Sequence, residues 1–160
     1  MPIITISRQM CSLGDEVAEE LSRKLGWELI TRNSLLFRFP DIAETTYDQR
    51  MLSESAKYFL KQSGDGGTFL DLLTQDLEDF LEENSAILMG FGSQMIFSGR
   101  RDAVHVRVFA PKAVRIQRAK KQFHVSDEEA GKIVDSADRR HKRFVTTVFG
   151  RDLTDPAYYD

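Results

Sequence analysis

The sequence predicts an α/β fold with three layers, in which helices cover both faces of a doubly wound parallel sheet. Short apolar runs of the length of buried strands alternate with longer segments whose apolar residues recur at helical spacing. Strands that alternate with helices in this way form a parallel sheet, because each crossover helix packs back on it. The 160 residues contain no internal repeat and no low-complexity linker. We therefore expect a single domain over residues 1–160.

The first elements are a strand, a tight loop and an amphipathic helix. Residues 3–6 form an apolar strand, and residues 7–14 turn the chain. From Val17 to Leu25 the apolar side chains recur at helical spacing. Gly26 suits the left-handed residue that ends such a helix. Residues 27–30 then form a short second strand.

The rest of the chain continues the alternation. We expect strands over residues 86–90 and 104–109, and helices over residues 33–38, 46–62, 68–83, 94–97, 112–123 and 126–150. The run at 86–90 is apolar throughout, which is typical of a strand buried on both faces. Ser126 and Glu129 form a capping box that opens the last helix. The sequence reaches Asp160 where a fifth strand would begin, so we expect four strands.

Composition and charge exclude several classes of function. The net charge of −3 gives no general attraction for nucleic acid. No apolar run is long enough to span a membrane, and the N-terminus lacks the basic-then-apolar pattern of a secretion signal. A single cysteine cannot form an internal disulfide, which fits a reducing compartment. We expect a cytoplasmic protein that binds neither nucleic acid nor membrane.

The loop over residues 7–14 stands where nucleotide-binding α/β proteins hold a phosphate. Free N–H groups and the dipole of the following helix point into such a loop. A working triphosphate loop adds a Lys and then a Ser or Thr at the start of the helix, but here Asp15 and Glu16 occupy these positions. At 4 Å, a carboxylate and a phosphate charge repel by about 4 kcal/mol at an effective dielectric near 20. The architecture therefore favours phosphate binding while these two residues oppose it.

Three loop residues are candidates for contact with a phosphate. Arg8 either contacts a phosphate or base, or forms a salt bridge that fixes the loop. Ser12 either offers its hydroxyl and N–H to an anion or caps the helix. Gly14 serves the conformation of the loop in either case.

A group of cations lies off the apolar stripe of the last predicted helix. Its members are Arg139, Arg140, Lys142 and Arg143. Guanidinium groups in such a position stabilise the charge on a transferring phosphoryl group. The alternative is a solvated helix face, on which the cations pair with Asp135 and Asp138 at helical spacing. The residues alone leave both interpretations open.

The remaining reactive residue types give weaker signals. Cys11 lies near a helix N-terminus, but Asp15 and Glu16 oppose a thiolate there, so we do not expect catalysis by this thiol. His141 lies on the apolar stripe and is expected to be a packed core residue. His105 and His124 have no ligand spacing with cysteines or carboxylates, so no protein metal site is expected.

Several segments, in order along nearly the whole chain, resemble the cytidylate kinase-like family of P-loop nucleoside-monophosphate kinases. The matching segments are residues 3–9 followed by Gly14, Gly90-x-Gly92-Ser93-Gln94 followed by residues 105–111, Asp138-Arg139-Arg140, and Asp155-Pro156-x-x-Tyr159-Asp160. The resemblance implies strand order 2-3-1-4-5 with the fifth strand missing. It also implies a core over residues 1–30 and 86–125, a monophosphate-binding helical region over about 31–85, and a lid-like helix over about 126–150.

The resemblance further implies a reaction and the residues that serve it. The family transfers the γ-phosphoryl group of ATP, carried with Mg²⁺, to a nucleoside monophosphate, usually CMP. On this basis Arg8, Ser12, Gly14, Arg139 and Arg143 are expected to bind phosphate or nucleotide. The candidates for contact with the transferring group are Arg139, Arg140 and Arg143.

Three positions depart from the family pattern. Asp15 stands where the family commonly has a basic residue, Phe91 replaces an arginine between the two glycines, and Met89 replaces an acid. These changes support two hypotheses: a kinase whose transfer activity is weak or lost, and a non-catalytic module that binds a nucleotide or another ligand for regulation or interaction. A third hypothesis is a structural protein that keeps the fold for homo-oligomerisation.

Overall fold

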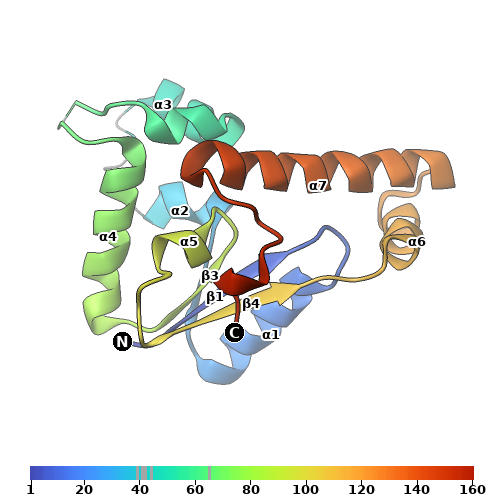
Figure 1. Ribbon diagram of the computed structural model, residues 1–160, viewed down its shortest axis with the longest axis horizontal. Helices are drawn as coiled ribbons and strands as arrows, with labels where there is room; N and C mark the ends of the chain where they lie inside the picture. Colours follow the sequence, from blue (N-terminus) through green and yellow to red (C-terminus); the bar gives the residue numbers. More distant parts are fainter. Residues whose placement is uncertain (39, 41–42, 44, 65) are drawn as a thin grey trace.

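The computed structural model describes residues 1–38, 40, 43, 45–64 and 66–160, and its centre is a four-stranded sheet (Figure 1). The strands are β1 (Ile3–Arg8), β2 (Glu28–Thr31), β3 (Ala86–Met89) and β4 (Ala103–Val108). They lie in the order β2-β3-β1-β4, and every pair is parallel. The predicted parallel sheet and the first four places of the expected strand order are confirmed.

Helices cover both faces of the sheet (Figure 1). They are α1 (Gly14–Leu25), α2 (Arg32–Arg38), α3 (Thr46–Glu54), α4 (Phe69–Glu83), α5 (Ser93–Ile96), α6 (Lys112–Phe123) and α7 (Asp127–Phe149), with 3₁₀ turns η2 (Ala56–Leu60) and η3 (Pro156–Tyr158). Ala18 of α1 packs with Ile6 and Ile87 on one face. The opposite face carries the larger core, to which α4 and α7 contribute. All four residues of β3 are buried, because both faces of that strand are covered.

The predicted helix over residues 46–62 is wrong at its second half. Helix α3 ends at Glu54, Ser55 is extended, and the chain continues as the 3₁₀ turn η2. This turn buries Tyr58 and Phe59. The Tyr58 ring stacks on that of Phe69, with ring centroids 5.2 Å apart. Tertiary packing of these two aromatic rings therefore overrides the helical propensity of the segment.

The predicted helix ends are confirmed where capping residues mark them. The Ser126 hydroxyl accepts from the N–H of Glu129, whose carboxylate accepts from the N–H of Ser126 in return. Gly26 and Gly150 end α1 and α7 in the left-handed conformation that glycine adopts without strain. The 23 residues of α7 thus form one continuous helix across the molecule (Figure 1).

The segment after α7 returns to the outer edge of β4. The N–H of Asp160 donates to the carbonyl of His105 over 2.9 Å, and the Asp160 carboxylate accepts from the N–H of His105 over 2.8 Å. Within the described ranges the sheet has no fifth strand. Asp160 nevertheless lies beside β4, on the side where the expected strand order has its fifth strand. No helix in the described part of the chain is long and apolar enough to cross a membrane.

Helix α7 is held on α6 by an ion pair whose guanidinium is buried. The Arg115 guanidinium donates to both carboxylate oxygens of Asp138, over 3.0 and 2.9 Å, and its Nε donates to the carbonyl of Ala110. The Arg115 side chain is 4% exposed and that of Asp138 is 32% exposed. A buried guanidinium that lost this carboxylate would leave several donors without acceptors.

We expect Asp138→Asn to lower the free energy of unfolding by about 1–3 kcal/mol, because Arg115 keeps its charge but loses its bidentate acceptor. Urea denaturation followed by circular dichroism measures the change. The matched control is Glu128→Gln on the same helix, which removes a solvent-exposed pair with Lys132 and should leave the stability nearly unchanged. Equal effects of the two substitutions would contradict a structural role for the Arg115–Asp138 pair.

Candidate functional site

A cavity of about 210 Å³ lies at the carboxyl ends of β1, β2 and β3. Ser7 and Arg8 reach it from β1 and Thr31 from β2, while Gly90, Phe91 and Gly92 form the turn after β3. Residues 140–145 of α7 contribute four further side chains: Arg140, His141, Phe144 and Val145. Ligands of open α/β sheets bind at this edge, because the loops and helix N-termini that follow parallel strands converge there. We therefore take this cavity as the candidate site.

Three guanidinium groups line the cavity and come from three different elements. They belong to Arg8 of β1, Arg32 of α2 and Arg140 of α7. No carboxylate is among the described residues that line it. A cavity with several cations and no carboxylate among its described lining residues is suited to a multiply charged anion, and guanidinium groups match the geometry of phosphate.

Arg32 is the most desolvated of the three cations. Its guanidinium lies over the rings of Phe144 and Phe59, 4.8 and 5.4 Å from their centroids, and one nitrogen donates to the carbonyl of Leu52 over 2.8 Å. Its Nε is buried and has no partner within the described part of the chain. Burial, and then the charge of Arg140, lower the pKa of Arg32. A buried donor without an acceptor is costly, so an anion that reached it would be bound strongly.

Arg8 joins the cavity to the loop before α1. Its Nε and Nη2 each lie 3.1 Å from the Asp15 carboxylate, which is half exposed. The salt bridge that was one of the two interpretations of Arg8 is therefore present, and Arg8 also lines the cavity. A side chain at position 14 would meet the Arg8 Cβ at 2.3 Å, so Gly14 is required by this close approach.

The loop itself is held in a conformation that glycine would adopt more easily. Cys11 and Leu13 have φ angles of 59° and 70°, and such left-handed residues cost about 1–3 kcal/mol each. Ser12 lies between them, buried, and its hydroxyl has no partner among the residues that the structure describes. The helix cap is Leu13, without a side-chain hydrogen bond, so Ser12 does not cap α1. Alternating backbone conformations of this kind direct successive N–H groups into a concave anion site.

The turn after β3 presents an apolar surface to the cavity. Gly90, Phe91 and Gly92 all have positive φ, and Phe91 is 5% exposed within the main core. A Cβ at Gly92 would lie 2.2 Å from the Phe149 ring, so this glycine is required by packing as well as by its φ of 73°. Met89, at the end of β3, is buried and also lines the cavity. The two departures from the family pattern in β3 and its turn therefore make this wall apolar.

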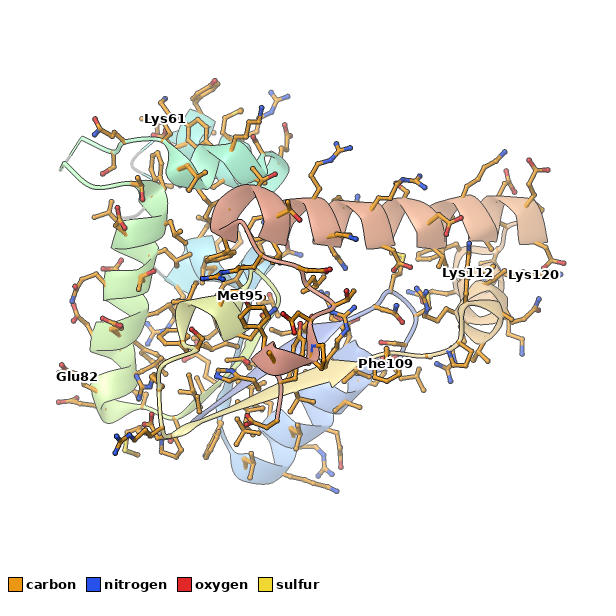
Figure 2. The ribbon with its side chains drawn as sticks, viewed as in Figure 1. Lys61, Glu82, Met95, Phe109, Lys112 and Lys120 are labelled. Carbon is orange, nitrogen blue, oxygen red and sulfur yellow. The ribbon has the colours of Figure 1, made fainter. Side chains whose placement is uncertain are left out.

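Helix α7 brings one of its predicted arginines to the cavity. All three predicted arginines are exposed residues, but only Arg140 is among the described residues that line the cavity, and Arg139 and Arg143 are not. The intrahelical pairs with Asp135 and Asp138 are absent among the described residues, because α6 supplies both partners. Lys112, labelled in Figure 2, lies 2.7 Å from Asp135, and Arg115 pairs with Asp138.

His141 lines the cavity instead of packing wholly in the core. Its ring is half-buried beside Arg8 and Arg140. Burial lowers the pKa of His141 most, and the charges of the two guanidinium groups lower it further, to about 4. The imidazole is therefore neutral at pH 7, and a bound anion would reverse part of the electrostatic cost of protonating it.

The other reactive residue types lie away from this cavity. Burial raises the pKa of the Cys11 thiol, which favours its protonated form. His105 forms a hydrogen bond of 2.7 Å between its Nδ1 and the Thr5 hydroxyl. No group of three histidine, cysteine or carboxylate side chains that could hold a metal occurs in the described ranges.

Arg32 is the residue that the sequence argument missed. It belongs to none of the motifs considered, and it lies at the junction between the strand predicted over residues 27–30 and the helix predicted over residues 33–38. The available signal was its position, directly after the strand that ends at Thr31, where the carboxyl end of a parallel strand delivers side chains to the ligand edge. Its burial depends on Phe59 and Phe144, which come from distant parts of the sequence and gave no local sign.

The chain has known relatives in sequence family and in structure. The model of the "Cytidylate kinase-like family" matches residues 3–160. No curated protein matches the chain. Among solved structures, an uncharacterized protein from Eubacterium ventriosum ATCC 27560 is 17% identical, with a TM-score of 0.75 over 100% of this chain and 85% of the other.

Two further solved structures are more distant. TT1252 from Thermus thermophilus is 18% identical, with a TM-score of 0.52 over 87% of this chain and 79% of its own. A shikimate kinase from Bacteroides thetaiotaomicron is 17% identical, with a TM-score of 0.49 over 91% of this chain and 81% of its own. At these identities the likeness concerns the fold.

The position of His141 makes stability depend on pH. As pH falls below 6.5, the ordinary pKa, the unfolded chain binds a proton that the folded chain does not bind until pH approaches 4. Stability from this group is thus present above 6.5 and lost as pH falls to 4, by about 3 kcal/mol in total. We expect His141→Gln to flatten the decline between about pH 7 and pH 4.5, measured by urea denaturation. An unchanged slope would show that His141 is not shielded from protons.

Proposed function

The chain belongs to the cytidylate kinase-like family, and on that premise we propose that its cavity binds a nucleoside monophosphate or a ligand of similar charge. Transfer of the ATP γ-phosphoryl group to that ligand is weak or lost. The observation that carries this proposal is the convergence of Arg8, Arg32 and Arg140 on one cavity at the ligand edge of the sheet.

The three arginines suit the phosphate of such a ligand. Arg32 is fixed by its two aromatic rings and by Leu52, so little side-chain entropy is lost when it binds. Its unpartnered Nε gains an acceptor, and Arg140 lies close enough to affect its pKa. Phe91 and Phe144 offer apolar contact to the rest of the ligand. CMP is the first ligand to test, because the family resemblance implies it as the acceptor.

The donor side fits a magnesium-bound triphosphate poorly. Asp15 lies at the N-terminus of α1, where the β-phosphate would be held, and it already occupies Arg8. No lysine follows Gly14, and the described residues hold no cluster of carboxylates for a metal. The free N–H groups of the loop and the Ser12 hydroxyl remain available to an anion, but only after the Arg8–Asp15 pair opens. We therefore assign no step to ATP or Mg²⁺.

The second candidate function is a non-catalytic module that binds a nucleotide or another anionic ligand for regulation or interaction. The Arg8–Asp15 pair favours this second function, because the Asp15 carboxylate would occupy the position of a donor phosphate and already pairs with the Arg8 charge that such a phosphate would need. The two candidates share the cavity and differ in the donor loop. The cytoplasmic location and a homo-oligomer stay predictions that accompany both.

We expect Arg32→Gln to weaken CMP binding by about 10–100-fold, because a charge-assisted contact of a desolvated guanidinium is lost. Isothermal titration calorimetry measures the dissociation constant, and thermal unfolding verifies the fold of the variant. Arg101→Gln is the control, since Arg101 is exposed in the turn before β4, at the amino ends of the strands and away from the cavity. Arg139→Gln and Arg143→Gln test whether these two arginines also contribute, as the resemblance implies. Wild-type protein that binds no nucleoside monophosphate would refute the proposal.

Asp15→Asn should raise the affinity for ATP by about tenfold, because one repelling charge is removed and Arg8 is released. Binding is measured by calorimetry, and γ-phosphoryl transfer to a panel of nucleoside monophosphates is measured in parallel with Mg²⁺ present. Glu19→Gln makes the same charge change one helical turn further from the loop and should have a much smaller effect. Wild-type turnover at ordinary kinase rates of about 1–100 per second would overturn the conclusion that transfer is weak or lost.

A further inference from the structure

Among the described residues that line the cavity, His141 is the only histidine, the residue type whose ordinary pKa lies near neutral pH. The cavity brings its ring together with Arg8 and Arg140, and Arg32 lines the same space. No hydrogen bond of the His141 ring occurs within the part of the chain that the structure describes, although the ring is half-buried. Both ring nitrogens are therefore available to a ligand.

We propose that His141 takes up a proton when a phosphate group enters the cavity and then donates a charge-assisted hydrogen bond to it. The proton comes from solvent, and no covalent bond of the ligand forms or breaks. His141 thereby becomes a fourth cationic contact, in addition to the three arginines. The inference rests on the proposed function, since it requires that an anion binds in this cavity.

The charges around His141 explain why the ring is neutral when the cavity is free of ligand. Arg8 of β1 and Arg140 of α7 oppose its protonation, and burial opposes it more strongly. Asp138 of α7 and Asp15 of α1 favour protonation but act more weakly. Both carboxylates are already paired with arginines, Asp138 with Arg115 and Asp15 with Arg8. Burial and the two arginines thus outweigh the two carboxylates, and His141 does not become a fourth positive charge beside the three arginines while no ligand is bound.

A bound anion reverses this balance. One negative charge at about 4 Å from the ring raises its affinity for a proton by roughly a thousandfold at an effective dielectric near 20. An anion that bridges the arginines also cancels their repulsion of the ring. The pKa of His141 starts from about 4, so an increase of this size makes proton uptake accompany binding in the physiological range. Linkage then requires that the anion binds more tightly as pH falls.

Sulfate is the sharpest probe, because it keeps its double negative charge across the relevant pH range and does not titrate itself. Calorimetric titration at about pH 6 in two buffers of different ionisation enthalpy gives the number of protons taken up, which we expect to approach one per bound sulfate. The same titration with CMP tests the physiological class of ligand. In wild-type protein, the Cε1 proton resonance of His141 in NMR spectra should move to the position of imidazolium when sulfate is added. This last measurement needs no variant.

His141→Gln should bind sulfate without proton uptake, and its affinity should lose the increase of up to about tenfold per pH unit that wild-type shows on acidification. His124→Asn is the matched control, because His124 lies exposed at the end of α6 with a φ of 54° that asparagine tolerates. It should leave both quantities unchanged. Binding with no proton uptake, or uptake that persists in His141→Gln, would overturn this inference and leave the proposed function standing. Absence of any sulfate, phosphate or CMP binding would overturn both.

Discussion

The backbone ladder on both sides of β1 is the constraint on which the site depends. Hydrogen bonds to β3 and β4 fix the register of this strand along its whole length, so the position of Arg8 at its carboxyl end is fixed as well. The parallel pairing of β2 with β3 brings Thr31 to the same edge of the sheet. Arg32 follows Thr31 directly and reaches the cavity from there. The convergence of cations on this edge is thus a consequence of strand direction, since all carboxyl ends of a parallel sheet lie together.

The charges of the two halves of the site are arranged differently. In the loop before α1, the Asp15 carboxylate neutralises Arg8, so the site has an internal counter-ion. Among the residues that the structure describes, no carboxylate pairs with Arg32 or Arg140 in the cavity, and Arg32 is kept in place by two aromatic rings and the carbonyl of Leu52 instead. Stacking stabilises a guanidinium without satisfying its donors, so its capacity for an anion is retained. The loop before α1 therefore carries its own counter-charge, whereas the cavity keeps guanidinium donors that suit an anion.

Local patterns in the sequence were enough for the sheet and for most helix boundaries. Apolar runs marked the four strands, and Gly26, Ser126 and Gly150 marked helix ends, because capping depends on neighbouring residues only. The helix break at Ser55 could not be predicted, since burial of Tyr58 and Phe59 depends on contacts with distant segments. The same limit applies to the site. Arg8 could be placed by its strand. The burial of Arg32 against Phe144, and which arginines of α7 line the cavity, depend on how α7 is rotated over the cavity, and no local sequence pattern determines that rotation.

The anchoring of α7 has a consequence for the kinetics of ligand entry. The Arg115–Asp138 pair ties the middle of this helix to α6, and the Phe149 ring at its end packs directly on Gly92 of the turn after β3. The helix and that turn bound the cavity from two sides and are in direct contact, so swinging the helix away would break this packing and the ion pair. In a site whose cover swings closed, a slow conformational step limits how fast the complex forms. For an anion that enters this cavity we therefore expect an association rate set by diffusion and by the attraction of Arg32 and Arg140, which falls as ionic strength rises.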